Sequence, residues 1–108
     1  MNDKTTTIAE IREFMQTFNA KRGWDKNQNV LNLVMALSVE TAELMEIFQW
    51  LHSSEAINIK NNDREYEHLQ EEIADVFWYL MEICDHFDVD LSTAVKDKGS
   101  KNAIKYPE

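Results

Sequence analysis

Apolar residues recur at helical spacing over two long stretches of the chain. In the second stretch, from about residue 64 to 87, they alternate steps of four and three, which is typical of a helix face in a bundle. That face comprises Leu69, Ile73, Val76, Leu80, Ile83 and Phe87. In the first stretch, from about residue 29 to 51, the main face comprises Leu33, Val34, Leu37, Leu44, Phe48 and Leu51. The polar segment "HSSEAINIKNNDRE" between the stretches is long enough to let the second helix return antiparallel to the first.

Two shorter helices are predicted on either side of this pair. Thr7 and Glu10 stand at capping-box spacing, so a helix is expected from about residue 7 to 21, stopping near Gly23. Near the other end, Asp90 is the expected N-cap of a last helix that meets Gly99. The chain is therefore predicted to be all-α and to form a single domain over residues 1–108.

The first long stretch carries a second apolar sector on another side of the helix. Its members are Met35, Val39, Ala42 and Met45. A helix that is apolar on most sides is buried on most sides. In so small a chain this predicts another subunit, and we expect a helical bundle whose four-helix core is completed by dimerisation.

Composition and charge agree with this fold and limit the partners. The 108 residues include only two Gly and one Pro, and their net charge of -9 disfavours binding to nucleic acid. The lone Cys84 excludes an intramolecular disulfide and fits a reducing, cytoplasmic setting. The first residues lack the features of a signal peptide, and the longest uncharged run, residues 27–39, is too short to span a bilayer. No membrane partner is expected.

Acidic residues interrupt both long helices beside their apolar faces. Glu40 and Glu43 are three residues apart on the first helix, and Glu72 and Asp75 on the second, where Tyr79 continues their stripe. If the helices pack antiparallel, four carboxylates converge, and a cation is needed to relieve their repulsion. Magnesium is the expected ion because it prefers carboxylate oxygens and bridges to substrate phosphates, and manganese is a candidate substitute.

The acidic residues admit other interpretations. A solvated helix face is the usual explanation for such spacing, and it is expected for Glu10, Glu13, Glu82, Asp85 and Asp88. Glu65 and His68 have the Glu-x-x-His spacing of di-iron carboxylate bundles, but that architecture needs the motif twice. No activating pattern surrounds Cys84, and no Gly-rich phosphate loop is present, which disfavours nucleophilic catalysis.

The ordered motifs "VETAELMEIFQW" and "LQEEIADVFWYL" resemble the MazG-like, all-α nucleoside triphosphate pyrophosphohydrolases, most closely the dCTP pyrophosphatase branch. The family motif, E-x-x-E followed by E-x-x-D, falls on Glu40, Glu43, Glu72 and Asp75. The resemblance extends through "VDLSTAV" to the terminal "KYP". The chain departs from the branch at Gly99, which is expected to interrupt the last helix where the branch has a larger residue, and near Gln28, where "DKNQN" replaces a frequent "FH" pair.

The resemblance implies magnesium-dependent hydrolysis between the α- and β-phosphates, which releases a nucleoside monophosphate and pyrophosphate, in dimers or tetramers. It implies that the four acids hold the metal and serve catalysis, and it makes dCTP or a modified nucleotide a candidate substrate. The residues it implies for substrate binding are Trp24, Trp50, Tyr79, Lys98, Asn102 and Lys105. The alternatives are a non-catalytic helical interaction protein with an acidic groove and a metal-binding bundle without hydrolase activity.

Overall fold

Helices make up almost all the regular structure in the computed structural model, which describes residues 1–26 and 28–108. Within these ranges there are α-helices and short 3-10 turns but no strand, which confirms the prediction of an all-α protein. The chain divides into two compact units. One unit contains Gln28–Ile83, and the other contains residues 1–26 together with Cys84–Glu108.

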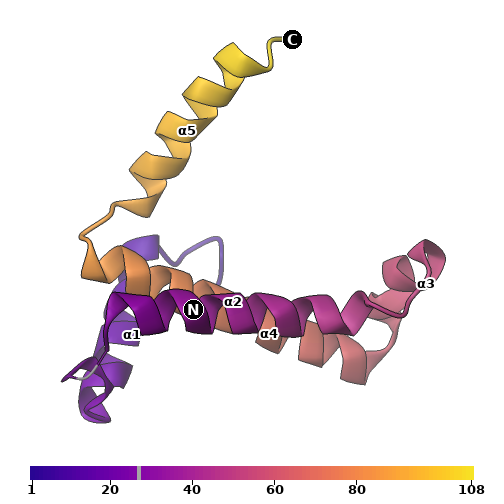
Figure 1. The fold of residues 1–108 in the computed structure, drawn as a ribbon, viewed down its shortest axis with the longest axis horizontal. Coiled ribbons are helices and arrows are strands. Elements are labelled where there is room, and N and C mark those ends of the chain that lie inside the picture. The colour runs from indigo at the N-terminus through magenta and orange to yellow at the C-terminus, as the bar shows by residue number, and fades with distance from the viewer. Residues whose placement is uncertain (27) are drawn as a thin grey trace. The chain divides into compact units, whose positions relative to one another are not determined.

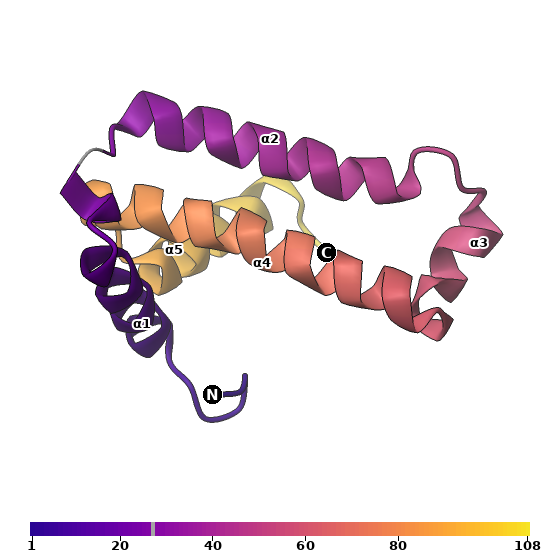
Figure 2. The ribbon, with the colours of Figure 1, turned by 90° about the horizontal axis from the view of Figure 1, so that it is seen from below.

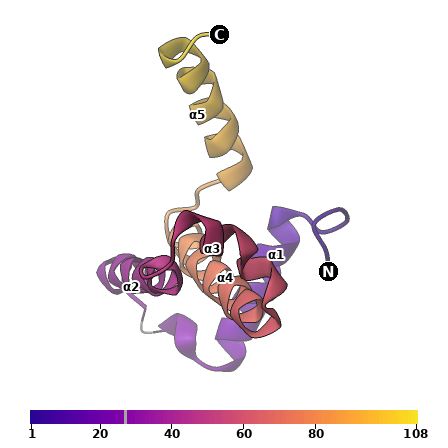
Figure 3. The same ribbon diagram turned by 90° about the vertical axis from the view of Figure 1, so that its right-hand side faces the viewer.

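The unit formed by Gln28–Ile83 is built on two long antiparallel helices. The helix α2 runs from Val30 to Phe48, and α4 runs from Asp63 to His86 and lies beside it in all three ribbon views (Figures 1, 2 and 3). Asn29 caps α2 by accepting a hydrogen bond from the backbone N–H of Asn32 at 2.9 Å. The two helices thus have the order and direction that the sequence predicted.

The connection between the long helices is more regular than the sequence predicted. It contains the short helix α3, Ser53–Ile57, and the 3-10 turn η2, Asn58–Asn61. Glu55 accepts a hydrogen bond from the His52 backbone N–H at 3.2 Å, which ties the start of α3 to its own first turn. A short capped helix was missed because its polar composition resembles that of a loop.

The buried side of α4 differs from the predicted face. Met81 and Cys84 are 1% and 6% exposed, whereas Ile73 and Phe87, both placed on the apolar face, are 51% and 59% exposed. The buried positions are thus displaced around the helix from the strict four-three repeat. A heptad repeat predicts burial against several neighbours. Among the described residues of this single chain, none covers the exposed members of the repeat.

On α2, the second apolar sector stays exposed, as the prediction of a further subunit requires. Met35, Val39 and Met45 are 60%, 56% and 61% exposed, whereas Leu33 on the main face is 4% exposed. The main face itself is incomplete, because Val34 is also 49% exposed. Exposed groups of large apolar side chains are typical of protein interaction surfaces.

The other unit begins with the capped helix α1, Ile8–Lys21. Thr7 and Glu10 form the predicted capping box, in which Thr7 Oγ1 accepts from the Glu10 N–H at 3.1 Å and Glu10 Oε1 accepts from the Thr7 N–H at 3.2 Å. Gly23 has a φ of 67°, a conformation that glycine adopts without strain, and it ends the helix where the sequence predicted. The turn η1, Trp24–Lys26, follows, and Asn27 in the predicted connection lies outside the described residues.

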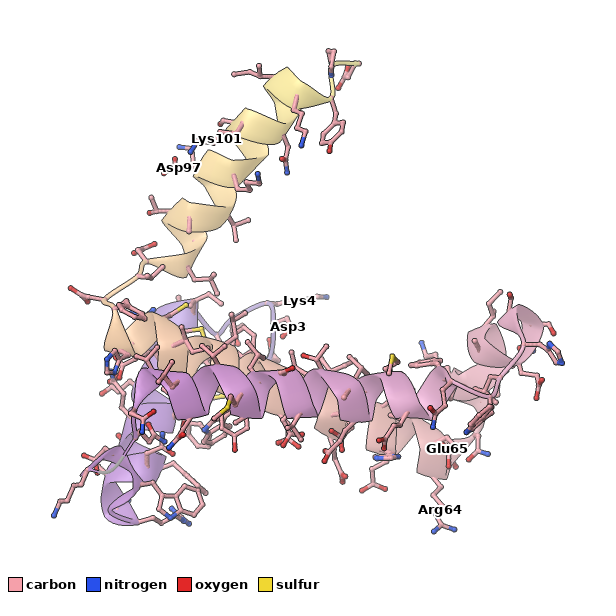
Figure 4. The ribbon with its side chains drawn as sticks, in the orientation of Figure 1. Asp3, Lys4, Arg64, Glu65, Asp97 and Lys101 are labelled. Atoms are coloured by element: carbon pink, nitrogen blue, oxygen red, sulfur yellow. The ribbon has the colours of Figure 1, made fainter. Side chains whose placement is uncertain are left out.

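The last helix, α5, runs from Leu91 to Lys105 with the predicted N-cap Asp90. Asp90 accepts a hydrogen bond from the Thr93 backbone N–H at 2.9 Å, and this bond lowers the pKa of the Asp90 carboxyl. The helix continues through Gly99, so the expected interruption there does not occur. Beyond Leu91 its residues are exposed, and Asp97 and Lys101 project from the same side one turn apart (Figure 4). Among the helices described, none combines the length and apolar character needed to cross a membrane.

Candidate metal centre

Three acidic side chains from α2 and α4 converge near the middle of the helix pair. One carboxylate oxygen from each of Glu40, Glu43 and Glu72 lies within 4.8 Å of the other two. Glu40 and Glu43 share a face of α2 because they are one turn apart, and the antiparallel α4 brings Glu72 opposite them. Asp75 is exposed, one turn after Glu72, and its negative charge raises the pKa of both Glu40 and Glu72.

Buried carboxylate oxygens of the acid cluster lack hydrogen-bond donors among the described residues. Glu40 Oε2 and Glu72 Oε2 are buried and have no hydrogen-bond donor against them among the described residues. Burial, followed by interactions with Glu43 and Asp75, raises the pKa of Glu40 from 4.5 to about 7. Burial also raises the pKa of Glu72. Buried carboxylate oxygens without donors are costly, so the cluster needs protons or a cation.

A divalent cation fits these residues. Mg²⁺ and Mn²⁺ bind carboxylate oxygens, and three such oxygens within one small volume match that preference. The two buried oxygens without donors are the groups that a cation would satisfy. The three acidic residues could therefore hold a metal ion.

Among the described residues, His68 is the basic side chain that contacts the cluster. His68 Nε2 lies 3.4 Å from Glu72 Oε1, with the imidazole half exposed and the carboxylate largely buried. Glu65 lies in the first turn of α4, two turns before Glu72 and near α3 (Figure 4). The acid cluster includes neither member of the Glu-x-x-His spacing, which disfavours a di-iron centre.

Tyr79 lies next to the acids, as its stripe on α4 predicted. Burial is the main cause that raises the pKa of Tyr79, and the charges of Glu82, Glu40, Asp75 and Glu43 raise it further. The Tyr79 phenol therefore lies within reach of the charges of both the acid cluster and Glu82. A neutral Tyr79 is able to donate a hydrogen bond into this negative region.

Glu82 is buried, which contradicts the expectation of a solvated residue. It is 9% exposed, and its Oε1 accepts hydrogen bonds from Trp78 Nε1 at 3.0 Å and from Gln28 Nε2 at 3.3 Å. The Trp78–Glu82 spacing of four residues was the available sequence signal, because an indole N–H one turn before an acid can reach it. The contact with Gln28 depends on helix packing and has no local signal.

The other residues implied in substrate binding are exposed. Trp50, just beyond the end of α2, is 86% exposed, and Trp24 is 53% exposed with its ring edge-on to Phe18 at 5.7 Å. The remaining three lie on α5: Lys98, Asn102 and Lys105. Trp24 and these α5 residues belong to the unit that lacks the acid cluster. Trp50, Tyr79 and the acids share the other unit.

Comparison with known proteins places this architecture in a family. A sequence model of the MazG-like family matches residues 35–108, well over half of the chain and all four acids. The chain is 37% identical over 101 residues to dCTP pyrophosphatase 1 of Rattus norvegicus and 38% identical to that of Homo sapiens. Each match covers 94% of this chain, and the chain spans 59% of the length of each relative.

A solved structure shows the same fold over the whole chain. The crystal structure of a pyrophosphatase from Archaeoglobus fulgidus superposes with a TM-score of 0.87 at 37% identity and covers 100% of this chain and 99% of that one. The family match, the curated relatives and the solved structure agree with one another and with the resemblance seen in the two acidic motifs. The chain belongs to the MazG-like family, near its dCTP pyrophosphatase branch.

Proposed function

We propose that the chain is a divalent-metal-dependent nucleoside triphosphate pyrophosphohydrolase, which converts a (deoxy)nucleoside triphosphate to the monophosphate and pyrophosphate. The observation that carries the proposal is the convergence of Glu40, Glu43 and Glu72 with two buried oxygens that lack donors. Relatives with pyrophosphatase activity in their names support it. We further propose that residues 1–108 act as one domain within a homodimer or homotetramer.

In this proposal Glu40, Glu43, Glu72 and Asp75 hold Mg²⁺, for which Mn²⁺ is a substitute. When bound, the ion supplies positive charge that offsets the triphosphate and favours attack by water on phosphorus. Because burial raises the pKa of Glu40 to about 7, cation binding below that pH would be accompanied by loss of the Glu40 proton. His68 lies against Glu72, with its Nε2 3.4 Å from Glu72 Oε1.

Tyr79 and the exposed aromatic and basic residues are proposed to bind the substrate. Trp50 and Trp24 offer stacking surfaces for a base, since both are more than half exposed. Tyr79 is placed beside the acids, where its hydroxyl can orient the substrate. For the phosphates we propose the cationic and amide side chains of α5, which are Lys98, Asn102 and Lys105.

The test is pyrophosphate release from a panel of nucleoside triphosphates with Mg²⁺ and then with chelator. We expect release that depends on the metal and products identified as the monophosphate and pyrophosphate. Glu43→Gln and Glu72→Gln should reduce kcat by at least about 100-fold, because each removes metal-binding charge with little change in volume. Glu71→Gln, at an exposed position on the same helix, is the matched control and should retain activity.

Release from no nucleotide under any of these conditions would contradict the proposal. The acidic surface would then be better explained as a groove for a basic partner. Unchanged turnover in both glutamine variants would instead keep the activity and remove these two residues from the catalytic centre.

A further inference from the structure

The His68 side chain lies against one oxygen of the Glu72 carboxylate on α4. The two residues are four apart and therefore share a face of the helix. His68 Nε2 is 3.4 Å from Glu72 Oε1, with the imidazole 50% exposed and the Glu72 side chain 11% exposed. A half-exposed ring thus contacts a largely buried carboxylate that belongs to the acid cluster.

The two oxygens of Glu72 have different surroundings. Oε1 faces the imidazole, whereas Oε2 is buried and has no hydrogen-bond donor against it among the described residues. An ionised carboxylate only accepts hydrogen bonds, so the contact with Oε1 requires that His68 Nε2 carry a proton. At 3.4 Å this contact is longer than an ideal N–H···O hydrogen bond, and a half-exposed ring is able to shorten it by rotation. His68 therefore engages one oxygen of Glu72 and leaves the other for a different partner.

That division affects the choice of cation, because a carboxylate binds metals through either one or both of its oxygens. Binding through both oxygens suits Ca²⁺, which accepts many oxygen ligands in a flexible geometry. Mg²⁺ requires a strict octahedral arrangement and is bound by few carboxylates, together with water and phosphate oxygens. An N–H donor on Oε1 competes with an ion for that oxygen, so it disfavours binding through both oxygens of Glu72.

We propose that His68 is a positioning residue whose imidazole N–H holds Glu72 Oε1 and presents Oε2 as a single ligand, so that the cluster favours the small ions Mg²⁺ and Mn²⁺ over the larger Ca²⁺. Glu40 and Glu43 supply the other oxygens of the cluster. Groups that hydrogen-bond a metal ligand commonly change metal affinity by about 10- to 100-fold. The inference rests on the proposed function because that function places a divalent cation at the acid cluster.

Two substitutions at His68 separate the effect of the N–H donor from that of packing. His68→Ala removes the donor, whereas His68→Gln keeps an N–H donor at a spacing where glutamine pairs with an acid on a helix. Alanine and glutamine both favour helix, so both variants should fold, and thermal melts check this. His86→Ala is the matched control, because it removes the other histidine of α4 from an exposed position in the last turn.

Ion binding is measured without nucleotide, from the loss of the free Mn²⁺ signal in electron paramagnetic resonance and its recovery when Mg²⁺ or Ca²⁺ displaces the bound Mn²⁺. We expect His68→Ala to raise the Kd for Mn²⁺ and Mg²⁺ by roughly 10-fold and to leave the Kd for Ca²⁺ within about two-fold of the wild type. A loss of packing alone would weaken the binding of all three ions together. His68→Gln and His86→Ala should retain the ion preference of the wild type.

The outcomes separate this inference from the proposed function. If His68→Ala weakens all three ions equally or changes none, or if His68→Gln behaves like His68→Ala, the inference is overturned even where the wild type releases pyrophosphate. If the ion preference shifts as expected but no nucleotide is hydrolysed, the function fails and the inference stands. If the wild type binds none of the three ions, the inference is overturned and the metal dependence in the proposed function fails with it.

Discussion

Replacing Glu40 by Gln removes the ionisable group with the most unfavourable environment in the acid cluster. In the folded chain, burial and the neighbouring Glu43, Asp75 and Glu72 raise the pKa of Glu40 from 4.5 to about 7. In the unfolded chain the carboxyl returns to its ordinary value. Glutamine has nearly the same volume and no charge, so Glu40→Gln isolates the electrostatic cost of the carboxylate from its packing.

The sign of the effect follows from proton binding. Because the folded pKa is higher than the unfolded pKa, the folded chain binds more protons between pH 4.5 and about 7. The free energy of unfolding of the metal-free wild type therefore decreases as pH rises through this window. Between about pH 5.5 and about pH 8, the free energy of unfolding of the metal-free wild type falls by about 2 kcal/mol. This is most of what a pKa shift of this size can contribute.

The assay is urea unfolding followed by circular dichroism in the presence of chelator, at fixed protein concentration and several pH values. The free energy of unfolding of Glu40→Gln minus that of the wild type should increase by about 2 kcal/mol between about pH 5.5 and about pH 8. Glu46→Gln, at an exposed acidic position on the same helix, is the matched control for the loss of one negative charge. Adding Mg²⁺ near pH 8 should stabilise the wild type more than Glu40→Gln.

A difference between Glu40→Gln and the wild type that stays constant with pH would refute the account of the cluster. It would mean that Glu40 is ionised in the folded chain without cost, so no cation would be needed to compensate it. Equal stabilisation of both proteins by Mg²⁺ would exclude Glu40 from the metal ligands, whatever the outcome of the pH series.

Three further predictions follow from the positions that the structure leaves exposed or without close neighbours among the described residues. Trp50→Ala should leave the thermal melt unchanged, because the side chain is 86% exposed, and should raise KM by about 10-fold or more through lost stacking; a large drop in Tm with normal kinetics would make Trp50 structural. Gly99→Ala should stabilise α5 by about 0.5–1 kcal/mol in a circular dichroism melt, because a Cβ there meets nothing within 4 Å; a loss of stability would reveal a neighbour against the glycine. Sedimentation at micromolar concentration should show an oligomer that Val39→Lys weakens, because the apolar sector of α2 is exposed; a well-folded wild-type monomer would contradict the shared core.

Much of the fold was predictable because its determinants are local. The starts of α1, α2 and α5 depend on side chains that cap their own first turns, as Thr7, Asn29 and Asp90 do. The pairing of acids one turn apart follows from 3.6 residues per turn and needs no knowledge of packing. The same short-range reasoning overstated the effect of Gly99, because one glycine costs a helix only about 1 kcal/mol and leaves its hydrogen bonds possible.

The tertiary structure decided which side chains are buried and which acids converge, because both depend on the rotation and register of α2 against α4. The repeat of apolar residues placed Ile73 on the buried face and Glu82 outside it, and the packed helices reverse both positions. Which acids meet is likewise a property of the pair: Glu40 and Glu43 come opposite Glu72, and Gln28 comes within hydrogen-bond distance of Glu82. The sequence by itself thus determined the helices and the chemical character of their acidic faces. The packing of one helix on the other decided which carboxylates lose water and which keep it, and therefore where a cation is needed.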